Sequence, residues 1–597
     1  MARWRKILGA GMAAAAMAAP AGPAVGGDDL TEARALFERN LAAIRARDRD
    51  AYLACYLDEP GLARTGPGGT LLGFETFAAQ AGEGWPDRFE GLDLRLVPVK
   101  PGVVYGSYRY RVRYGGREDS GLSERLFVRT RAGWRIAMTS AFPALEGTPP
   151  PPRALAGATL VDGTGRPPVP GSVVLIRDGR IECAGPRAAC PIPPGVETLD
   201  VSGSWIVPGL IDAHVHFSQT GWADGRPDAL DLRSTHPYEA VQARLRSDPG
   251  RFLRAYLCSG VTAVFDVGGY PWTWGLPGRT ERDTLSPRVS AAGPLLSTRD
   301  HWLNLPAERQ FIHLDGAGTA AAGVRYLAEH GAGAVKVWYI VEQGQTADQH
   351  APAVKAAGEE ARRLGLPLIV HATGLDEAKE ALRAGATLLV HSVWDKPVDD
   401  EFLDLARANR AVYCPTLVVR DGYMALYRAA LSGQPPPLDD PRGCVDPATR
   451  DMVADTAPLE GKGPGQEALD RRAAAMAAQA ETMAANLRRV RDAGITIAMG
   501  TDAGNPLTLH GPSVFAEMEA MERAGMTPRD VLIASTRGGA AALGRLDELG
   551  TVEAGKLADL LVVSSDPGRS IAALRDAVWI VRGGVVRSTQ ELSAPGR

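Results

Sequence analysis

Cysteine is scarce in this sequence, and its spacing excludes one kind of metal site. The 597 residues contain six cysteines, and no two of them form a Cys-x-x-Cys pair, so a zinc site built from thiolates is not expected. Cys183 and Cys190 are close enough in sequence to pair in an oxidising compartment, with two buried thiols as the alternative. The remaining cysteines are expected to be buried free thiols: Cys55, Cys258, Cys414 and Cys444.

A strong excess of charge of either sign is also absent. The formal net charge is -4, which gives no reason to expect nucleic acid as a partner. Charged residues make up 23% of the chain and hydrophobic residues 45%, as in soluble globular proteins. The length exceeds what a single core usually holds, so we expect two or three domains.

The first apolar stretch, residues 7–19, is too short and too rich in alanine to span a membrane. It follows a basic start and precedes the small residues Ala19-Pro20-Ala21, an order typical of a secretory signal peptide, here residues 1–27. The stretch has no adjacent arginine pair and no cysteine at the cleavage point, so neither a twin-arginine route nor a lipoprotein anchor is indicated. We expect a periplasmic or secreted protein without membrane association; a disordered alanine-rich tail is the alternative.

Residues 28–148 have the pattern of a separate α+β unit. Helical periodicity runs over residues 30–47, and segments of alternating polarity, typical of antiparallel strands, follow from residue 103 onward. This helix-then-sheet order, with a closing Gly133-Trp134-Arg135-Ile136 strand, resembles the nuclear-transport-factor-2-like (NTF2-like, SnoaL-like) fold. A run of prolines within residues 149–153 favours an extended linker after this unit.

Polar and aromatic residues of the front unit are candidates for a pocket. Ordinary packing is the alternative, and no acid–base constellation is recognisable among them. The candidates are Asp50, Tyr52, Arg111 and Trp134.

From residue 154 onward the pattern changes to short strands and Asp-Gly turns, and the same pattern returns near the C-terminus. We therefore expect one small β-sandwich built from both flanks, residues 154–206 and 548–590. Residues 207–547 between them alternate apolar runs with helical stretches, which predicts an α/β fold of the TIM-like (β/α)8 barrel type. The eight apolar runs are 206–207, 261–267, 289–292, 334–339, 367–371, 387–391, 411–419 and 495–499.

A His-x-His pair ends the first strand of the predicted barrel. Successive side chains of a strand alternate faces, so His214 and His216 lie on the same side, where two imidazoles can bind one divalent metal ion. The alternative is two hydrogen-bonded histidines in a turn.

Further residues that can bind metal lie in or close to the ends of the later runs: Lys336 within the fourth strand, and His371, His391 and Asp502 at the ends of the fifth, sixth and eighth strands. Singly, each has an ordinary explanation, such as a core histidine, a lysine with its stem buried, or a helix cap. Because catalytic groups of such barrels gather at the C-terminal ends of the strands, their joint occurrence predicts one shared site.

Residues 154–590 resemble the amidohydrolase superfamily. The resemblance rests on Pro208-Gly209-Leu210-Ile211-Asp212-Ala213-His214-Val215-His216, the strand lysine, the two single-histidine strands and Gly500-Thr501-Asp502-Ala503-Gly504, in that order. The branch with imidazolonepropionase-related proteins and metal-dependent Xaa-Pro dipeptidases is the most similar.

The resemblance implies two divalent metal ions, zinc being the expected element. His214, His216 and Asp502 would hold the more buried ion, and His371 and His391 the second. Lys336, carboxylated by carbon dioxide to a carbamate, would bridge both; an unmodified lysine would indicate a single ion.

The same resemblance implies hydrolysis by a metal-bridging hydroxide, with Asp502 transferring the proton to the leaving nitrogen. Tyr339 would donate to the developing oxyanion or else pack in the wall, and His301 would face the substrate. Tyr413 and His510 are weaker candidates for residues that face the substrate. Residues 431–466 would form a loop over the barrel mouth or lie exposed and disordered.

We therefore expect a secreted hydrolase of an amide, whose substrate is a dipeptide, an N-acyl amino acid or a cyclic amide, with a homo-oligomer as an open alternative. The first rival is a one-metal imidazolonepropionase-like or deaminase-type hydrolase, although no His-x-x-Glu follows at His371 as in nucleoside deaminases. The second rival is a ligand-binding protein with an inert barrel.

Overall fold

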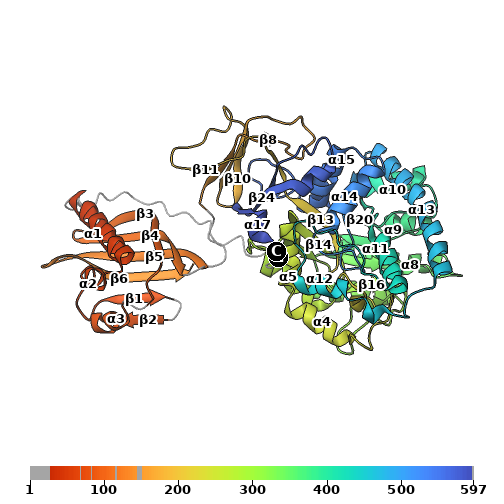
Figure 1. The fold of residues 1–597 in the computed structure, drawn as a ribbon, viewed down its shortest axis with the longest axis horizontal. Coiled ribbons are helices and arrows are strands. Elements are labelled where there is room, and N and C mark those ends of the chain that lie inside the picture. The colour runs from red at the N-terminus through yellow and green to blue at the C-terminus, as the bar shows by residue number, and fades with distance from the viewer. Residues whose placement is uncertain (1–26, 67–68, 82–83, 115–116, 144–150, 594–597) are drawn as a thin grey trace, which may run out of the picture. The chain divides into compact units, whose positions relative to one another are not determined.

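The computed structural model describes residues 27–66, 69–81, 84–114, 117–143 and 151–593 (Figure 1). The chain divides into two compact units, Met1–Thr148 and Pro149–Arg597. The predicted signal peptide lies, except for Gly27, outside the described residues, as do the first two prolines of the predicted linker.

The first unit is an α+β structure with a six-stranded sheet in the order β2-β1-β6-β5-β4-β3. Figure 1 shows α1 lying across this sheet, and Phe37 and Leu41 of α1 are buried in the core with Tyr108 and Phe127 of the sheet. The elements are α1 (Gly27–Ala46), α2 (Arg49–Leu53), β1 (Ala63–Gly66), β2 (Gly69–Leu72), α3 (Phe74–Gln80), β3 (Arg88–Lys100), β4 (Val103–Tyr114), β5 (Arg117–Thr130) and β6 (Gly133–Pro143).

The first three strands of this unit were not predicted from the sequence. Strand β3 contains Gly91 and Pro98, and its residues are all at least partly exposed, so it lacks the alternation that marks a half-buried strand. Strands β1 and β2 have only four residues each, too few for a period to be recognised.

The flanks of the second unit meet in one sheet. In the order β25-β24-β23-β12-β8, strand β12 pairs antiparallel with β23, which brings Trp205 opposite Val563. A second sheet has the order β10-β9-β7-β11. The strands are β7 (Arg153–Ala156), β8 (Thr159–Leu160), β9 (Ser172–Arg177), β10 (Arg180–Pro186), β11 (Glu197–Asp200), β12 (Trp205–Pro208), β23 (Leu560–Val563), β24 (Ala577–Arg582) and β25 (Val585–Ser588).

The segment between the flanks contains parallel strands with helices around them (Figure 1). One sheet has the order β13-β14-β15 and another the order β17-β16-β18-β19-β20-β21-β22. These strands are mainly Val, Leu and Ile because both faces of a parallel sheet are covered. They are β13 (Leu210–Val215), β14 (Val261–Asp266), β15 (Arg288–Ala291), β16 (Leu295–Ser297), β17 (Phe311–His313), β18 (Val335–Trp338), β19 (Leu368–His371), β20 (Leu388–Val390), β21 (Val412–Cys414) and β22 (Thr496–Ile497).

Individual backbone hydrogen bonds connect the two parallel sheets. The Ala213 N–H donates to the Met499 carbonyl at 3.0 Å, and the Gly333 N–H donates to the Ala291 carbonyl at 2.9 Å. One strand assignment needs correction: residues 206–207 belong to β12 of the flank sheet, and the strand that carries His214 is β13. Strands β16 and β17 were not predicted.

The helices of this segment include those that follow the site strands. They are α4 (Tyr238–Ser247), α5 (Gly250–Cys258), α6 (Leu276–Thr280), α7 (Ala317–Glu329), α8 (Ala347–Leu364), α9 (Leu375–Arg383), α10 (Asp400–Ala408), α11 (Val419–Ser432), α12 (Pro447–Ala454), α13 (Gln466–Asp492), α14 (Ser513–Arg523), α15 (Pro528–Ile533), α16 (Gly539–Ala542) and, after the last strand, α17 (Thr589–Leu592). None of the described helices combines the length and the apolar composition that crossing a membrane requires.

Residues 431–466 contain a helix and buried side chains, although residues 431–435 are exposed. They contain α12, whose N-terminus is capped by Asp446 through the Thr449 N–H at 3.0 Å. Val453 and Leu459 are buried in a cluster with Trp222 and Leu230. The alternative of an exposed, disordered segment is therefore wrong.

Two disulfides are present, and two cysteines of the described chain are free and buried. Cys183 pairs with Cys190, as one of the two alternatives had it. The expectation of free thiols is wrong for Cys258 and Cys444, which are bonded although 186 residues separate them. Sequence spacing gives no sign of this bond, because it depends on residues 431–446 folding back onto the end of α5.

The long-range disulfide is expected to contribute much more to stability than the short one. In the chain-entropy treatment a closed loop of this length contributes about 5 kcal/mol, and the seven-residue loop about 2 kcal/mol. Urea unfolding of Cys258→Ser/Cys444→Ser should therefore show a larger loss of unfolding free energy than Cys183→Ser/Cys190→Ser. Equal losses, or a larger loss from the short loop, would contradict this expectation.

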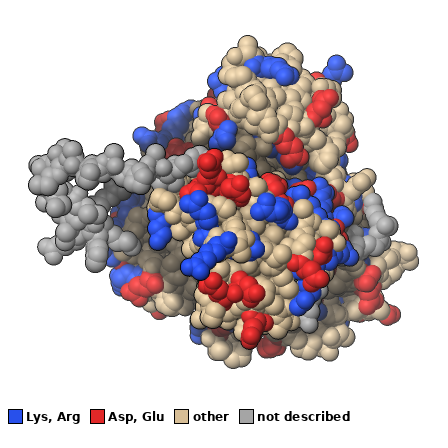
Figure 2. Space-filling view, turned by 90° about the vertical axis from the view of Figure 1, so that its left-hand side faces the viewer, with Lys and Arg blue, Asp and Glu red and all other residues tan. Residues whose placement is uncertain are grey.

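The charged side chains visible on the face in Figure 2 are of both signs. Lys and Arg lie beside Asp and Glu over much of that face, without a broad region of one sign. This mixture agrees with the small formal net charge of the chain, -4.

Candidate metal centre

One pocket of the second unit, about 220 Å³ in volume, contains every side chain that the sequence suggested as a metal ligand. Its lining includes His214, His216, Lys336, His371, His391 and Asp502. They come from β13, β18 and β19, from the residues directly after β13 and β20, and, for Asp502, from the loop that follows β22. The common position at the C-terminal ends of parallel strands explains how segments almost 300 residues apart supply one site.

Three ligand atoms form a small triangle at the centre of the group. Nε2 of His214 lies 3.2 Å from Nε2 of His216 and 3.2 Å from Oδ1 of Asp502, and the last two atoms are 3.0 Å apart. Ligands bound about 2.0–2.2 Å from one zinc ion lie roughly 2.8–3.6 Å from one another when the angle between them at the metal is about 90–109°. The spacing of the three atoms therefore fits one divalent ion.

The hydrogen bonding of His216 also indicates a cation site. Its Nδ1 lies 2.7 Å from the carbonyl of Gly268, which can only accept, so in the neutral imidazole Nδ1 carries the hydrogen and Nε2 keeps a lone pair. That lone pair faces Oδ1 of Asp502, a buried oxygen with no hydrogen-bond donor. Two acceptors at this distance repel each other, and a cation between them removes the repulsion.

The other two histidines lie against the triangle. The ring centroid of His391 is 4.9 Å from that of His214 and 4.3 Å from that of His371. His214, His391 and Asp502 each offer one ligand atom within 4.8 Å of the others. The donor set of imidazole nitrogens and carboxylate oxygen suits zinc and similar divalent metals.

Burial sets the charge of these groups. It is the main cause that lowers the pKa of His214, His371 and His391 well below the usual value, so these imidazoles are neutral, as metal binding requires. Burial also lowers the pKa of Lys336 to about 7, so that a large share of the amine is uncharged near neutral pH. An uncharged amine is the form that reacts with carbon dioxide.

Several residues that position the ligands were missed in the sequence. The carboxylate of Asp212 accepts hydrogen bonds from the His214 N–H at 3.2 Å, the Thr501 N–H at 3.0 Å and the Thr501 hydroxyl at 2.6 Å. It thereby fixes the two segments that carry His214 and Asp502. The available signal was an acidic residue inside an apolar strand; burial raises its pKa to about 7.

Backbone conformation at the site is unusual. His391 has φ 75°, Asp502 has φ 61° and Thr416, whose hydroxyl lies 2.6 Å from Nδ1 of His391, has φ 43°. Non-glycine residues in this region cost about 1–3 kcal/mol each and persist where the surroundings require them. Gly500 is required for a different reason, because an added Cβ would lie 2.4 Å from Sγ of Cys414 and 2.9 Å from Cβ of His214.

Tyr339 is not placed as an oxyanion donor. Its hydroxyl donates to the carbonyl of Ala347 at 2.5 Å, at the start of α8, and its side chain is buried outside the pocket lining. We therefore correct the predicted catalytic role to the alternative, packing in the wall.

The remaining candidates also have structural partners. His301 contacts the pocket wall through Phe311, at 4.5 Å between ring centroids, but does not line the pocket, and its Nδ1 accepts from the Leu303 N–H. The Tyr413 hydroxyl accepts from the Val393 N–H at 3.0 Å. His510 is hydrogen-bonded through Nδ1 to the Tyr256 hydroxyl and through Nε2 to the Gln219 carbonyl.

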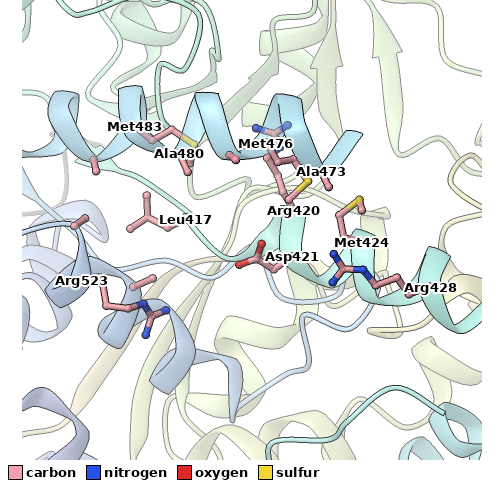
Figure 3. A pocket seen from close by; sticks show the side chains of 14 residues that line it. Leu417, Arg420, Asp421, Met424, Arg428, Ala473, Met476, Ala480, Met483 and Arg523 are labelled. Carbon is pink, nitrogen blue, oxygen red and sulfur yellow. The ribbon is translucent and has the colours of Figure 1, made fainter. Parts of the chain in front are cut away.

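A larger pocket, about 500 Å³, lies between α11, α13 and α14 (Figure 3). Its lining is mostly alanine, methionine and arginine and contains no histidine, so the metal ligands lie elsewhere. Arg420 lines both pockets.

Known proteins resemble this chain over about two thirds of its length or more. An imidazolonepropionase from Mesorhizobium japonicum is 28% identical over 446 residues, which cover 68% of this chain and 89% of that protein. A 5-methylthioadenosine/S-adenosylhomocysteine deaminase from Symbiobacterium thermophilum is 25% identical over 435 residues, which cover 69% of this chain and 84% of that protein. The crystal structure of a Xaa-Pro dipeptidase with bound methionine in the active site has a TM-score of 0.55 at 21% identity, covering 73% of this chain and 100% of that chain.

The family assignment follows from a match to a protein-family model, which covers more than half of the chain. Amidohydrolase-type neighbours imply a TIM-like barrel for the parallel strands described above, and they support a hydrolase acting on carbon–nitrogen bonds. Residues 205–587 match the amidohydrolase family over nearly the whole second unit, and the chain belongs to that family.

Proposed function

We propose that this protein is an exported, metal-dependent hydrolase that cleaves an amide bond in a dipeptide, an N-acyl amino acid or a cyclic amide. The observation that carries the proposal is the cluster of neutral imidazoles around Asp502, where two acceptor atoms face each other at 3.0 Å. Such an arrangement is stable when a cation occupies it, and a carboxylate beside a bound cation is placed for proton transfer.

When bound, divalent cations supply Lewis acidity that lowers the pKa of water and polarises a carbonyl group. The protein's own contribution is proton transfer and positioning. Asp502 takes a proton from the attacking water and delivers it to the leaving nitrogen, while the water oxygen bonds to the carbonyl carbon. The carbon–nitrogen bond breaks, and the products are a carboxylic acid and an amine.

His214, His216 and Asp502 would hold one ion, His371 and His391 the second, and a carbamate on Lys336 would bridge them. The low polarity around Lys336, which is 2% exposed, favours the uncharged amine and supports this assignment. A carbamate is an anion with two oxygen atoms, and therefore suits two cations better than an ammonium group does.

Arg420 favours a substrate with a free carboxylate. Its guanidinium lies over the ring of Trp394, 4.8 Å from the centroid, and both side chains line the metal-site pocket. Among the described residues Arg420 forms no ion pair; the carboxylate that acts on it electrostatically is that of Asp421, which lines the larger pocket and not the metal-site pocket. A half-buried guanidinium without an ion-pair partner at a pocket wall is suited to bind a substrate carboxylate.

The variant Arg420→Met is expected to raise KM for an N-acyl amino acid roughly 10- to 100-fold, because a charged hydrogen bond to the substrate is lost. The value of kcat should change little, since Arg420 is not among the proton-transfer groups. Steady-state kinetics with the substrate and with its carboxylate-blocked amide test this. Arg428→Met, which lines only the larger pocket, is the matched control; an equal effect in both variants would contradict the assignment.

The proposal as a whole is tested by a library of dipeptides, N-acyl amino acids, cyclic amides and lactones, using the zinc-loaded full chain. Turnover of at least one amide, absent with Asp502→Asn and lost on chelation, is the expected result. Failure on every amide and lactone, with metal bound, would reject hydrolysis and leave a binding protein with an inert barrel, and turnover of lactones alone would reject an amide as the substrate.

A one-metal hydrolase of the imidazolonepropionase or deaminase type is the second candidate. It is favoured by the three ligand atoms of His214, His216 and Asp502, which lie 3.0 to 3.2 Å from one another and suffice to bind one ion. It is also favoured by the similarity to imidazolonepropionase. Metal analysis decides between the two: two ions per chain support the bridged centre, and one ion with unmodified Lys336 supports the alternative.

Export and the NTF2-like assignment of the first unit belong to the same proposal. The two disulfides support an oxidising compartment. The order of α1 before a six-stranded sheet, in which all neighbouring strands except β1 and β6 are antiparallel, supports the assignment of the first unit.

A further inference from the structure

The first unit contains a buried positive charge without a counter-ion. Arg125 lies on β5 and is 4% exposed, and no carboxylate lies within ion-pair distance of it in the described part of the chain. Arginine remains charged at all accessible pH values. Buried charges are normally paired, because an isolated charge in a medium of low polarity is costly.

The groups that do contact Arg125 are all uncharged. Its Nη1 donates to the hydroxyls of Ser123, at 2.8 Å, and Thr139, and its Nη2 donates to the Tyr108 hydroxyl at 2.8 Å. Nη1 also lies 3.3 Å from the carbonyl of Glu124. Nε has no acceptor. The hydroxyls orient the guanidinium but do not neutralise it.

Arg125 lines a cavity of about 350 Å³ within the first unit, a volume within the range of small-molecule sites. Ser123, Tyr108 and Thr139 line the same cavity. No aspartate or glutamate lines it. The other charged residue of the lining is Arg64, which is exposed, so both charges of the wall are positive and Arg125 is the buried one.

The rest of the wall is largely aromatic. Tyr52 and Trp85 meet edge to face at 5.5 Å between centroids, and Phe89 stacks with Tyr110 at 6.3 Å. Both pairs line the cavity, as does Phe77. Aromatic walls bind a flat apolar group, and a fixed guanidinium binds a carboxylate.

We propose that the cavity of the first unit is a binding site for a small aromatic carboxylate, whose carboxylate group is the counter-ion of Arg125. The site is separate from the metal centre and does not depend on the hydrolytic function proposed above. Of the residues suggested from the sequence as pocket candidates, Tyr52 lines it, whereas Asp50 is exposed, Arg111 lies 3.5 Å from Glu90, and Trp134 is packed in the core.

The test uses the full chain and three probes: phenylacetate, 2-phenylethanol as the uncharged analogue, and acetate as the carboxylate without a ring. Titration calorimetry should show phenylacetate binding at least about tenfold more tightly than either analogue, since a hydrogen bond to a charged group contributes that much. Arg125→Met should weaken phenylacetate binding roughly 10- to 100-fold. Arg129→Met, on the same strand but outside the cavity lining, should leave it unchanged.

Amide hydrogen exchange of the wild-type protein locates the site independently of any variant. Phenylacetate should slow exchange in peptides from β4, β5 and β6, and it should do so equally in Asp502→Asn, which excludes product binding at the metal centre. If Arg125→Met does not fold, this measurement still shows whether phenylacetate binds in the cavity of the first unit. Protection confined to the second unit, equal binding of all three probes, or full binding by a folded Arg125→Met variant would overturn the proposal.

Discussion

Replacing Asp502 with asparagine is expected to lower kcat/KM about 10⁴-fold, the upper end of what proton transfer by one positioned group contributes. Asparagine has nearly the same shape, but its amide can neither accept the proton of the attacking water nor supply a negative charge to a cation. The loss should fall mainly on kcat, because Asp502 acts on the reacting atoms. Steady-state kinetics on the best amide from the library measures it.

The Asp502→Asn result needs two controls. Metal analysis of the variant separates loss of an ion from loss of proton transfer alone; circular dichroism confirms that it folds. Asp492→Asn, at the exposed end of α13, is the matched carboxylate-to-amide change and should retain full activity. Retention of activity within tenfold by Asp502→Asn would mean that another group transfers the proton.

The residues of the candidate centre could be predicted because two simple rules coincide. Parallel strands covered on both faces appear in sequence as short apolar runs, and the polar residue that ends each run lies at the functional end of the sheet. His371 ends β19, His391 directly follows β20, and Asp502 comes shortly after β22. Each residue could therefore be placed from its own neighbours, and all line one pocket.

Features that depend on contacts across the chain were missed. The bond between Cys258 and Cys444 depends on how residues 431–446 pack, which no local pattern records. Tyr339 was assigned a role from its strand, but its hydroxyl meets the carbonyl of Ala347. Strand direction does not determine the partner of a long side chain.

The lack of a counter-ion at Arg125 could not be predicted from the sequence, for a related reason. Arg125 occurs in a strand where its neighbours in sequence include Glu124, so the local pattern suggests an ordinary exposed pair. In the structure the two side chains lie on opposite faces of β5. The Glu124 carboxylate accepts hydrogen bonds from the hydroxyls of Tyr105 and Ser140, while Arg125 lines the cavity.

Replacing Lys336 with alanine is expected to lower kcat/KM at least about 10³-fold, because the variant would lose the proposed carbamate, an anion that would contribute several kcal/mol between two cations. The buried position of Lys336, on β18 among the other ligands, leaves a small cavity after truncation. A short carboxylic acid can enter this space and offer the two oxygen atoms that a carbamate would provide. Added acetate or propionate should therefore restore part of the activity in a saturable manner.

This rescue distinguishes a carbamate from an ammonium group. Lys379→Ala, which removes a lysine paired with Asp399 and Glu401 outside the pocket, should retain activity and show no response to acetate. Wild-type protein equilibrated with isotopically labelled bicarbonate should show a carbamate carbon resonance that Lys336→Ala lacks. If the resonance is missing and carboxylic acids do not rescue the variant, Lys336 acts as a simple amine, and the one-metal centre becomes the better description.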